Sequence, residues 1–412
     1  MMNVNNRWFQ LVASLIAMVM IANLQYAWTL FVNPMREANG WSLADVQWAF
    51  TLFILCQTWV QPLDGWLIDR LGPRGFITAA GVLCGFGWAG MAYATSLPML
   101  YALYALAGTG AAFVYSGCIG SALKWFQDRR GFASGIIAAG FGGGTALFIP
   151  IIASIIRNDG YRTAFLWTGV TQGIVIFVVA QFLRHPAHGA PVAAAKAGAR
   201  VGTHQYTTAE MVRTPHFYVM YAMFVLMAIG GLMVTAQAGP MAQSWGLSAA
   251  ALTLAASVSP IANGASRIFW GWASDRIGRE RSMIIAFVLQ AVALLLVLGV
   301  GHLSAAWFAT TLVLVYFTWG EIYSLFPSMV GDYFGSKCAT SNYAVLYTAK
   351  GAASIVGGGM AALLFERFGT WSAGFYGSAA LALVAAALAG GLYAAGAPER
   401  RVVAGVPAVS RS

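Results

Sequence analysis

Twelve apolar segments, each long enough to cross a lipid bilayer, constrain this chain more than any other feature. A membrane-spanning helix needs about 20 predominantly apolar residues. Only 9% of the residues are charged, against about 25% in a soluble domain. The sequence therefore predicts an all-α membrane protein with twelve transmembrane helices, near 8–32, 46–68, 75–95, 98–122, 132–156, 162–184, 216–238, 249–272, 282–301, 304–329, 340–363 and 371–395.

A short motif occurs twice, 206 residues apart in a chain of 412. Its copies are Gly65-x-x-x-Asp69-Arg70-x-Gly72-x-Arg74 and Gly271-x-x-x-Asp275-Arg276-x-Gly278-Arg279. Pro34-Met35 and Pro240-Met241 repeat at the same offset, and Trp41-x-Leu43 and Trp245-x-Leu247 repeat at 204. We therefore expect two related six-helix halves at 1–184 and 214–395, a cytoplasmic linker at 185–213 and a cytoplasmic tail at 396–412. Repeats of this kind place a substrate site near the midplane, where rocking of the halves gives alternating access.

The charge distribution predicts the topology. The net charge is +10, but most of the 23 Lys and Arg residues fall in segments that are cytoplasmic if the N-terminus is inside. This asymmetry follows the positive-inside rule, so it favours an inner-membrane protein with both termini in the cytoplasm over a nucleic-acid-binding protein. External loops hold only Arg36, Arg157, Arg162 and Arg367.

Two cations, Arg267 and Lys350, remain inside the membrane in this topology. A charge there is costly, so it marks a functional site by default. Tyr343, Tyr347 and Lys350 share one helix face, and Trp319 and Tyr323 lie four residues apart in the preceding segment. A guanidinium suits bidentate carboxylate binding and a lysine adds a point charge. The pattern predicts an aromatic cage for an anion with two acidic ends.

Glu321 is the only carboxylate that we place well inside an apolar segment, and its role is open. It could neutralise Lys350 or Arg267, rest hydrogen-bonded or protonated against a neighbouring helix, or couple transport to protons. An ideal helix turns Glu321 away from the Trp319 and Tyr323 face, although Gly320 and Pro327 can distort the helix. Polar pairs such as Gln57 and Gln61 are expected to form hydrogen bonds between helices.

The repeated motif lies in cytoplasmic turns, so we expect it to control helix docking during conformational change rather than to touch substrate. The residues assigned to this gating role are Asp69, Arg70, Arg74, Asp275, Arg276 and Arg279. The four cysteines are scattered without metal-like spacing, and no nucleophile and base pair is evident. We therefore expect no metal, no cofactor and no enzyme activity.

Charge balance separates two mechanisms. If both cations lack a protein counter-charge, moving them through a closed state costs several kcal/mol per ion. A bound anion would compensate them, so a loaded carrier would reorient more easily than an empty one, which is the logic of exchange. A carrier with an internal titratable acid could return empty after taking up a proton, which is symport.

The chain resembles the major facilitator superfamily in GWLIDRLGPR and GWASDRIGR, which fall between the expected helices. Over nearly its full length it is similar to the oxalate:formate antiporter family, in NLQYAWTLFVNP, ALYALAGTGAAFVYSG, KWFQDRRGFASG, EMVRTPHFYV, NGASRIFWGWASDRIGR, YFTWGEIYSLFPS and NYAVLYTAKGAASIVGGG. The resemblance implies that Arg267 and Lys350 bind the carboxylates of oxalate, and that the site is lined by Gln25, Tyr26, Tyr115, Trp319 and Tyr323.

Two positions depart from related patterns. Glu321 stands where the resemblance to an oxalate carrier implies a small neutral residue. Asn263, four residues before Arg267, stands where the related proton-linked monocarboxylate transporters carry an Asp, and this difference disfavours symport.

We thus expect a secondary transporter of small carboxylates, exchanging a dicarboxylate such as oxalate for a monocarboxylate such as formate. The alternative is proton-coupled symport of a monocarboxylate such as lactate or pyruvate. A non-transporting sensor is disfavoured because no large cytoplasmic signalling domain is present in the sequence. The expected partners are carboxylate anions and the lipid bilayer, and the internal repeat makes a working monomer plausible.

Overall fold

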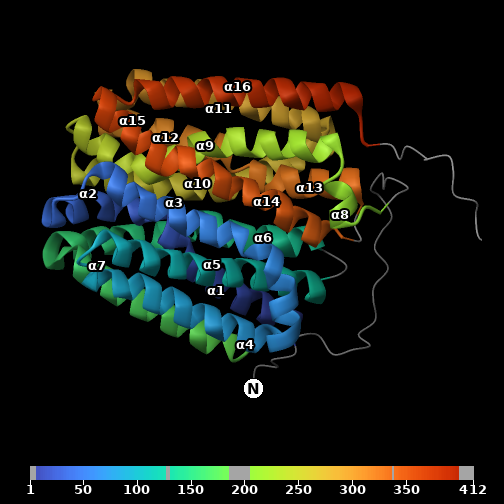
Figure 1. Cartoon of the computed structure of the whole chain (residues 1–412), viewed down its shortest axis with the longest axis horizontal. Helices are drawn as coiled ribbons and strands as arrows, with labels where there is room; N and C mark the ends of the chain where they lie inside the picture. Colours follow the sequence, from blue (N-terminus) through green and yellow to red (C-terminus); the bar gives the residue numbers. More distant parts are fainter. Residues whose placement is uncertain (1–5, 127–129, 185–204, 336–337, 399–412) are drawn as a thin grey trace, which may run out of the picture.

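The computed structural model describes residues 6–126, 130–184, 205–335 and 338–398, apart from the side chains at positions 65–66, 69–71, 130–132 and 134. All regular elements in these ranges are helices, which confirms the predicted fold class. The first half comprises α1 (Arg7–Tyr26), α2 (Trp28–Asn39), α3 (Leu43–Trp59), α4 (Gln61–Gly90), α5 (Leu97–Trp125), α6 (Arg130–Gly143) and α7 (Ile149–Ala180). These helices, blue to green, lie along one side of the molecule in Figure 1.

The second half lies against the first with its long helices running in the same general direction (Figure 1). It follows the short α8 (Thr208–Met211) and comprises α9 (Pro215–Ser244), α10 (Ala249–Ile277), α11 (Arg279–Val300), α12 (Ala305–Trp319), α13 (Ile322–Phe334), α14 (Ala339–Ile355), α15 (Ala361–Phe368) and α16 (Ser372–Ala395). One-turn helices at Met91–Tyr93, Gly144–Leu147 and Gly301–Leu303 and a π-helical turn at Val356–Met360 join some of these elements.

Ten stretches of the described chain are long and apolar enough to cross a membrane. One of them, Gly135–Ala180, contains two of the predicted segments, which meet at Gly160. The only predicted segment without such a stretch is α10, which carries Arg267. Together these helices account for all twelve predicted segments.

The internal repeat is visible in the backbone. Gly40 and Gly246, 206 residues apart, both have φ near +67°, and Gly72 and Gly278, also 206 apart, have φ of 67° and 97°. Residues with a β-carbon rarely adopt these angles, so the glycines permit the ends of α2 and α10 and the kink at Gly72 within α4. The offset of 206 also relates the N-cap residues Ser42 and Ser248. Trp41 and Trp245, paired at 204 in the sequence, are therefore not equivalent in the structure.

The two halves meet closely at the end of the molecule predicted to be external. The Gln243 side chain donates to Glu37 at 3.0 Å, and these residues are also 206 apart. The backbone N–H of Gly239 donates to the Thr29 hydroxyl. A β-carbon at Gly239 would lie 2.2 Å from the Thr29 carbonyl oxygen, so only glycine permits this approach of α9 to α2.

The second copy of the repeated motif ties three helices together at the opposite end. Arg279, at the start of α11, pairs with Asp275 at 2.7 Å and Asp332 of α13 at 3.2 Å. Arg276 stacks on Trp272, with its guanidinium carbon 3.9 Å from the ring centroid. In the first copy Arg74 donates to Gln181 at 2.8 Å. The side chains of Asp69 and Arg70 lie outside the described residues, so the gating assignment stays a prediction.

Candidate functional site

Arg267 lies on α10 at the junction of the two halves and is only 4% exposed. Its guanidinium donates to the Ala138 carbonyl of α6 at 2.8 Å and to the Asn263 side-chain oxygen at 3.0 Å. Its Nε has no acceptor among the described residues. Two neutral oxygens therefore orient the guanidinium and leave its charge uncompensated.

Lys350 reaches across from α14 and is fully buried. Its ammonium donates to Gln57 at 2.7 Å, to Gln25 at 2.8 Å and to the Tyr347 hydroxyl at 3.4 Å. All three acceptors are neutral. The lysine thus links the second half to α1 and α3 of the first half through neutral partners alone.

Tyr323 lies beside both cations. The guanidinium carbon of Arg267 is 4.6 Å from the Tyr323 ring centroid and the ammonium of Lys350 is 5.7 Å from it. A cation placed this way is attracted by the negative face of the ring. The cations are therefore neighbours at one site, as the sequence suggested.

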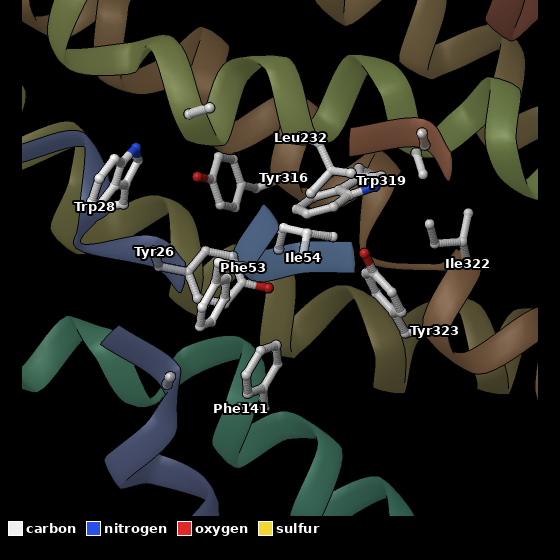
Figure 2. Packing of buried hydrophobic residues seen from close by; sticks show 14 of the residues in the cluster. Tyr26, Trp28, Phe53, Ile54, Phe141, Leu232, Tyr316, Trp319, Ile322 and Tyr323 are labelled. Carbon is white, nitrogen blue, oxygen red and sulfur yellow. The ribbon is translucent and has the colours of Figure 1, made fainter. Parts of the chain in front are cut away.

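Aromatic rings from both halves enclose the cations. Tyr115 stacks on Tyr347 with 5.6 Å between centroids, and Tyr26 lies 5.6 Å from Phe141. Trp319 contacts Tyr323 edge-on at 5.5 Å. Figure 2 shows Tyr26 and Phe141 facing Tyr323 and Trp319 across the centre of the packed region. The structure thus brings together all seven residues predicted to line the site, while their contact with substrate stays a prediction.

No carboxylate in the described parts of the chain lies within ion-pair distance of Arg267 or Lys350. Glu321 lies at the junction of α12 and α13 and is fully buried. Neither of its carboxyl oxygens has a hydrogen-bond partner among the described residues. Permanent pairing of Glu321 with either cation is therefore not seen, and no contact explains why a carboxyl occupies this position.

Several buried donors around the two cations have no acceptor within the described residues. An unsatisfied buried donor costs about 1–3 kcal/mol, so such a cluster is uncommon in a purely structural core. A bound anion that accepts several hydrogen bonds would relieve this cost. The donors are the side-chain nitrogens of Gln25, Gln57 and Trp319, the Nε of Arg267 and the hydroxyls of Tyr323 and Tyr343.

Sequence reasoning missed three contributors to the site. Phe141 faces Lys350 at 5.5 Å from its ring centroid, and the Ala138 carbonyl binds Arg267. Gln57 was interpreted only as a helix-packing residue, although its spacing on a helix with Gln61 was a usable signal. Phe141 and Ala138 lie in a run of glycines and alanines that carries no such signal.

Asp64 corrects the statement that Glu321 is the only carboxylate well inside an apolar segment. Asp64 lies near the start of α4 and is 2% exposed. One carboxyl oxygen accepts from the Ser116 hydroxyl of α5, and the other has no partner among the described residues. It was overlooked because it precedes the charged cytoplasmic turn by only a few residues.

A duplicated helical bundle with uncompensated cations buried between its halves defines a membrane transporter. The profile of the Major Facilitator Superfamily matches the chain twice, over residues 13–237 and 218–412. The chain is 40% identical over 384 residues to the oxalate:formate antiporter of Oxalobacter formigenes, a match that covers 93% of this chain and 91% of that protein. The chain therefore belongs to the major facilitator superfamily and, within it, to the family of the oxalate:formate antiporter.

Two more distant relatives are also transporters by name. The chain is 29% identical to the uncharacterized MFS-type transporter YhjX of Escherichia coli (strain K12), over 85% of this chain and 86% of that protein. It is 26% identical to monocarboxylate transporter 11 of Homo sapiens, over 57% of this chain and 49% of that protein. These memberships make the protein a transporter and not an enzyme, in agreement with the sequence analysis.

Proposed function

We propose that the protein exchanges small carboxylates across the membrane, taking a dicarboxylate such as oxalate in return for a monocarboxylate such as formate. One observation carries the proposal. Arg267 and Lys350 are both buried beside the ring of Tyr323, with no carboxylate of the described chain close enough to pair with either. The similarity to the oxalate:formate antiporter supports the same substrate class.

The geometry suits an anion with two acidic ends. Arg267 offers a planar donor group already oriented by Asn263 and Ala138, and an oriented donor loses less freedom on binding. Lys350 offers a second charge at the other end. The surrounding rings exclude water, which strengthens both ionic contacts. A dicarboxylate compensates both charges and a monocarboxylate compensates one.

Exchange follows from this charge balance. Reorientation must carry both cations through a closed state, where an uncompensated charge costs several kcal/mol. The protein supplies only neutral oxygens to Arg267 and Lys350 in the described residues, so the substrate has to supply the negative charge. Reorientation with an anion bound is then favoured over reorientation without one.

Alternating access would use the contacts at the two ends of the molecule. The bonds from Gln243 to Glu37 and from Gly239 to Thr29 join the halves at the external end. Arg279, Asp275 and Asp332 would control docking at the cytoplasmic end. We propose that the protein works as a monomer in the inner membrane with both termini in the cytoplasm, which the distribution of Lys and Arg supports.

Proton-coupled symport of a monocarboxylate is the second candidate, and the buried carboxyl of Glu321 is the observation that favours it. Against it, Asn263 supplies a neutral amide oxygen to Arg267 where an ionisable acid would be needed.

Ligand binding to the purified full-length protein tests the proposal. We expect oxalate to raise the melting temperature more than formate or lactate, because only oxalate compensates both cations. Arg267→Gln and Lys350→Gln should each abolish the difference between oxalate and formate. Stabilisation by lactate alone, with no response to oxalate, would contradict the proposed substrate class.

A further inference from the structure

Gln57 is the nearest hydrogen-bond partner of the Lys350 ammonium, at 2.7 Å. Gln25 at 2.8 Å and the Tyr347 hydroxyl at 3.4 Å complete the set. An ammonium has three donors and no acceptor. Its protons are therefore shared among three neutral oxygens, and this chemistry requires that each glutamine turn its oxygen end toward Lys350.

The opposite end of each amide carries an NH₂ group. The side-chain nitrogens of Gln25 and Gln57 are buried and have no acceptor in the described part of the chain. Each planar amide thus presents its donors beside the lysine charge. A carboxylate oxygen that enters next to Lys350 can accept from the ammonium and from an amide N–H together, as charge-assisted hydrogen bonding favours.

The position of Gln57 relative to Lys350 is set by bonds on both sides along α3 and α14. The Thr51 hydroxyl donates to the Ser354 carbonyl at 2.9 Å. The Trp59 indole donates to the Thr348 carbonyl at 3.1 Å. These bonds fix the register of α3 against α14, so the contact between Gln57 and Lys350 is held in place from both sides.

We propose that Gln57 determines substrate specificity: with Gln25 it forms an amide pocket around Lys350 that binds the second carboxylate of a dicarboxylate, while Arg267 binds the first. This inference rests on the proposed function. A monocarboxylate held at Arg267 leaves the amide pocket bound to Lys350 as observed, so its binding depends little on Gln57.

The choice of glutamine over glutamate follows from charge. A glutamate at position 57 would lie at ion-pair distance from Lys350, because the present oxygen is 2.7 Å away. It would neutralise the lysine permanently and repel the second carboxylate. The neutral amide holds the ammonium in place and leaves its charge available to substrate.

The test compares Gln57→Glu, Gln57→Leu and Gln61→Glu in the full-length protein. Gln61 is a matched control: it is buried one turn further along, and its side chain donates to the Gln57 backbone at 3.2 Å rather than to substrate-site groups. Binding of oxalate, malonate, formate and acetate is measured by calorimetry and by melting temperature. We expect Gln57→Glu to weaken dicarboxylate binding by at least about 10-fold, the order expected for losing a charge-assisted contact, and to change monocarboxylate binding by less than about 3-fold.

Gln57→Leu should weaken dicarboxylate binding less than Gln57→Glu, because it removes the amide donor without neutralising Lys350. Gln61→Glu should keep the wild-type preference. Equal losses for mono- and dicarboxylates in Gln57→Glu, or the same change in Gln61→Glu, would overturn the role of Gln57.

Failure of the proposed function would be seen in the wild-type protein rather than in the Gln57 variants. If the wild-type protein binds monocarboxylates only, the dicarboxylate substrate class is wrong. The role of Gln57 in selecting dicarboxylates then falls with it. If the wild type does bind dicarboxylates but Gln57→Glu keeps the wild-type preference for them, only the role of Gln57 is wrong.

Discussion

Arg267 and Lys350 lie over the same ring: the guanidinium carbon is 4.6 Å and the ammonium 5.7 Å from the centroid of Tyr323. The two residues come from α10 and α14, so the second half of the chain supplies both charges. The first half supplies neutral oxygens to both of them, from Gln25, Gln57 and Ala138. Asn263 and Tyr347 of the second half supply the other two. An anion bound between the cations would therefore contact both halves.

Arg267→Lys should reduce exchange by at least about 100-fold, or about 3 kcal/mol. A lysine keeps the charge but lacks the planar guanidinium. In the native protein the guanidinium donates to both Ala138 and Asn263 and, among the described residues, keeps its Nε free for substrate. The measurement is the initial rate of oxalate exchange in proteoliposomes with matched protein content. Arg281→Lys is the control, because Arg281 is exposed and bonds to Tyr393 at the surface. Near-normal exchange by Arg267→Lys would contradict the fork geometry.

Asn263→Asp should raise the KM for oxalate by about 10- to 100-fold, because a carboxylate 3.0 Å from Arg267 forms an ion pair that competes with substrate. The neutral amide of the native Asn263 competes less strongly with substrate for Arg267. The KM for external oxalate, measured at saturating internal formate, checks this. An unchanged KM would show that the guanidinium does not bind substrate through the face next to Asn263.

Glu321→Gln should leave exchange within about 3-fold of wild type, because the carboxyl contacts neither cation and the amide preserves its size. The response of uptake to an imposed proton gradient should also stay the same. Loss of transport in Glu321→Gln, together with a wild type that requires inward protons, would establish symport instead.

Gly239→Ala should slow exchange by about 10-fold, because its β-carbon would lie 2.2 Å from the Thr29 carbonyl and force the external contact apart. The matched control is Gly377→Ala on α16, where an added β-carbon meets no atom within 4 Å. The measurements are the exchange rate and the melting temperature of both variants. Wild-type exchange by Gly239→Ala would mean that the close approach of α9 to α2 is not needed in the cycle.

Much of the fold follows from local sequence. Apolar length predicts the helices. The repeated motif marks a break in each half, because Gly72, at a kink within α4, and Gly278, at the end of α10, both have positive φ. The offset of 204 between Trp41 and Trp245 wrongly paired these residues, because the repeat has an offset of 206. The backbone angles follow that offset, whereas the positions of the tryptophans do not.

Part of the site was predictable because a buried charge is rare in an apolar segment. Arg267 and Lys350 are evident for that reason, and helical spacing adds Tyr347. The Ala138 carbonyl was not predictable, because every residue has a carbonyl and only the packing of α6 against α10 selects this one. Asp64 was missed because it lies only a few residues before the charged cytoplasmic turn, and its contact with Ser116 of α5 joins positions far apart in the sequence.

The most direct test of the central claim is uptake of labelled oxalate into proteoliposomes loaded with oxalate, formate, lactate or buffer, with and without an imposed proton gradient. Two uncompensated cations predict uptake that requires internal oxalate or formate and does not respond to the gradient. Uptake into buffer-loaded vesicles driven by inward protons would contradict exchange.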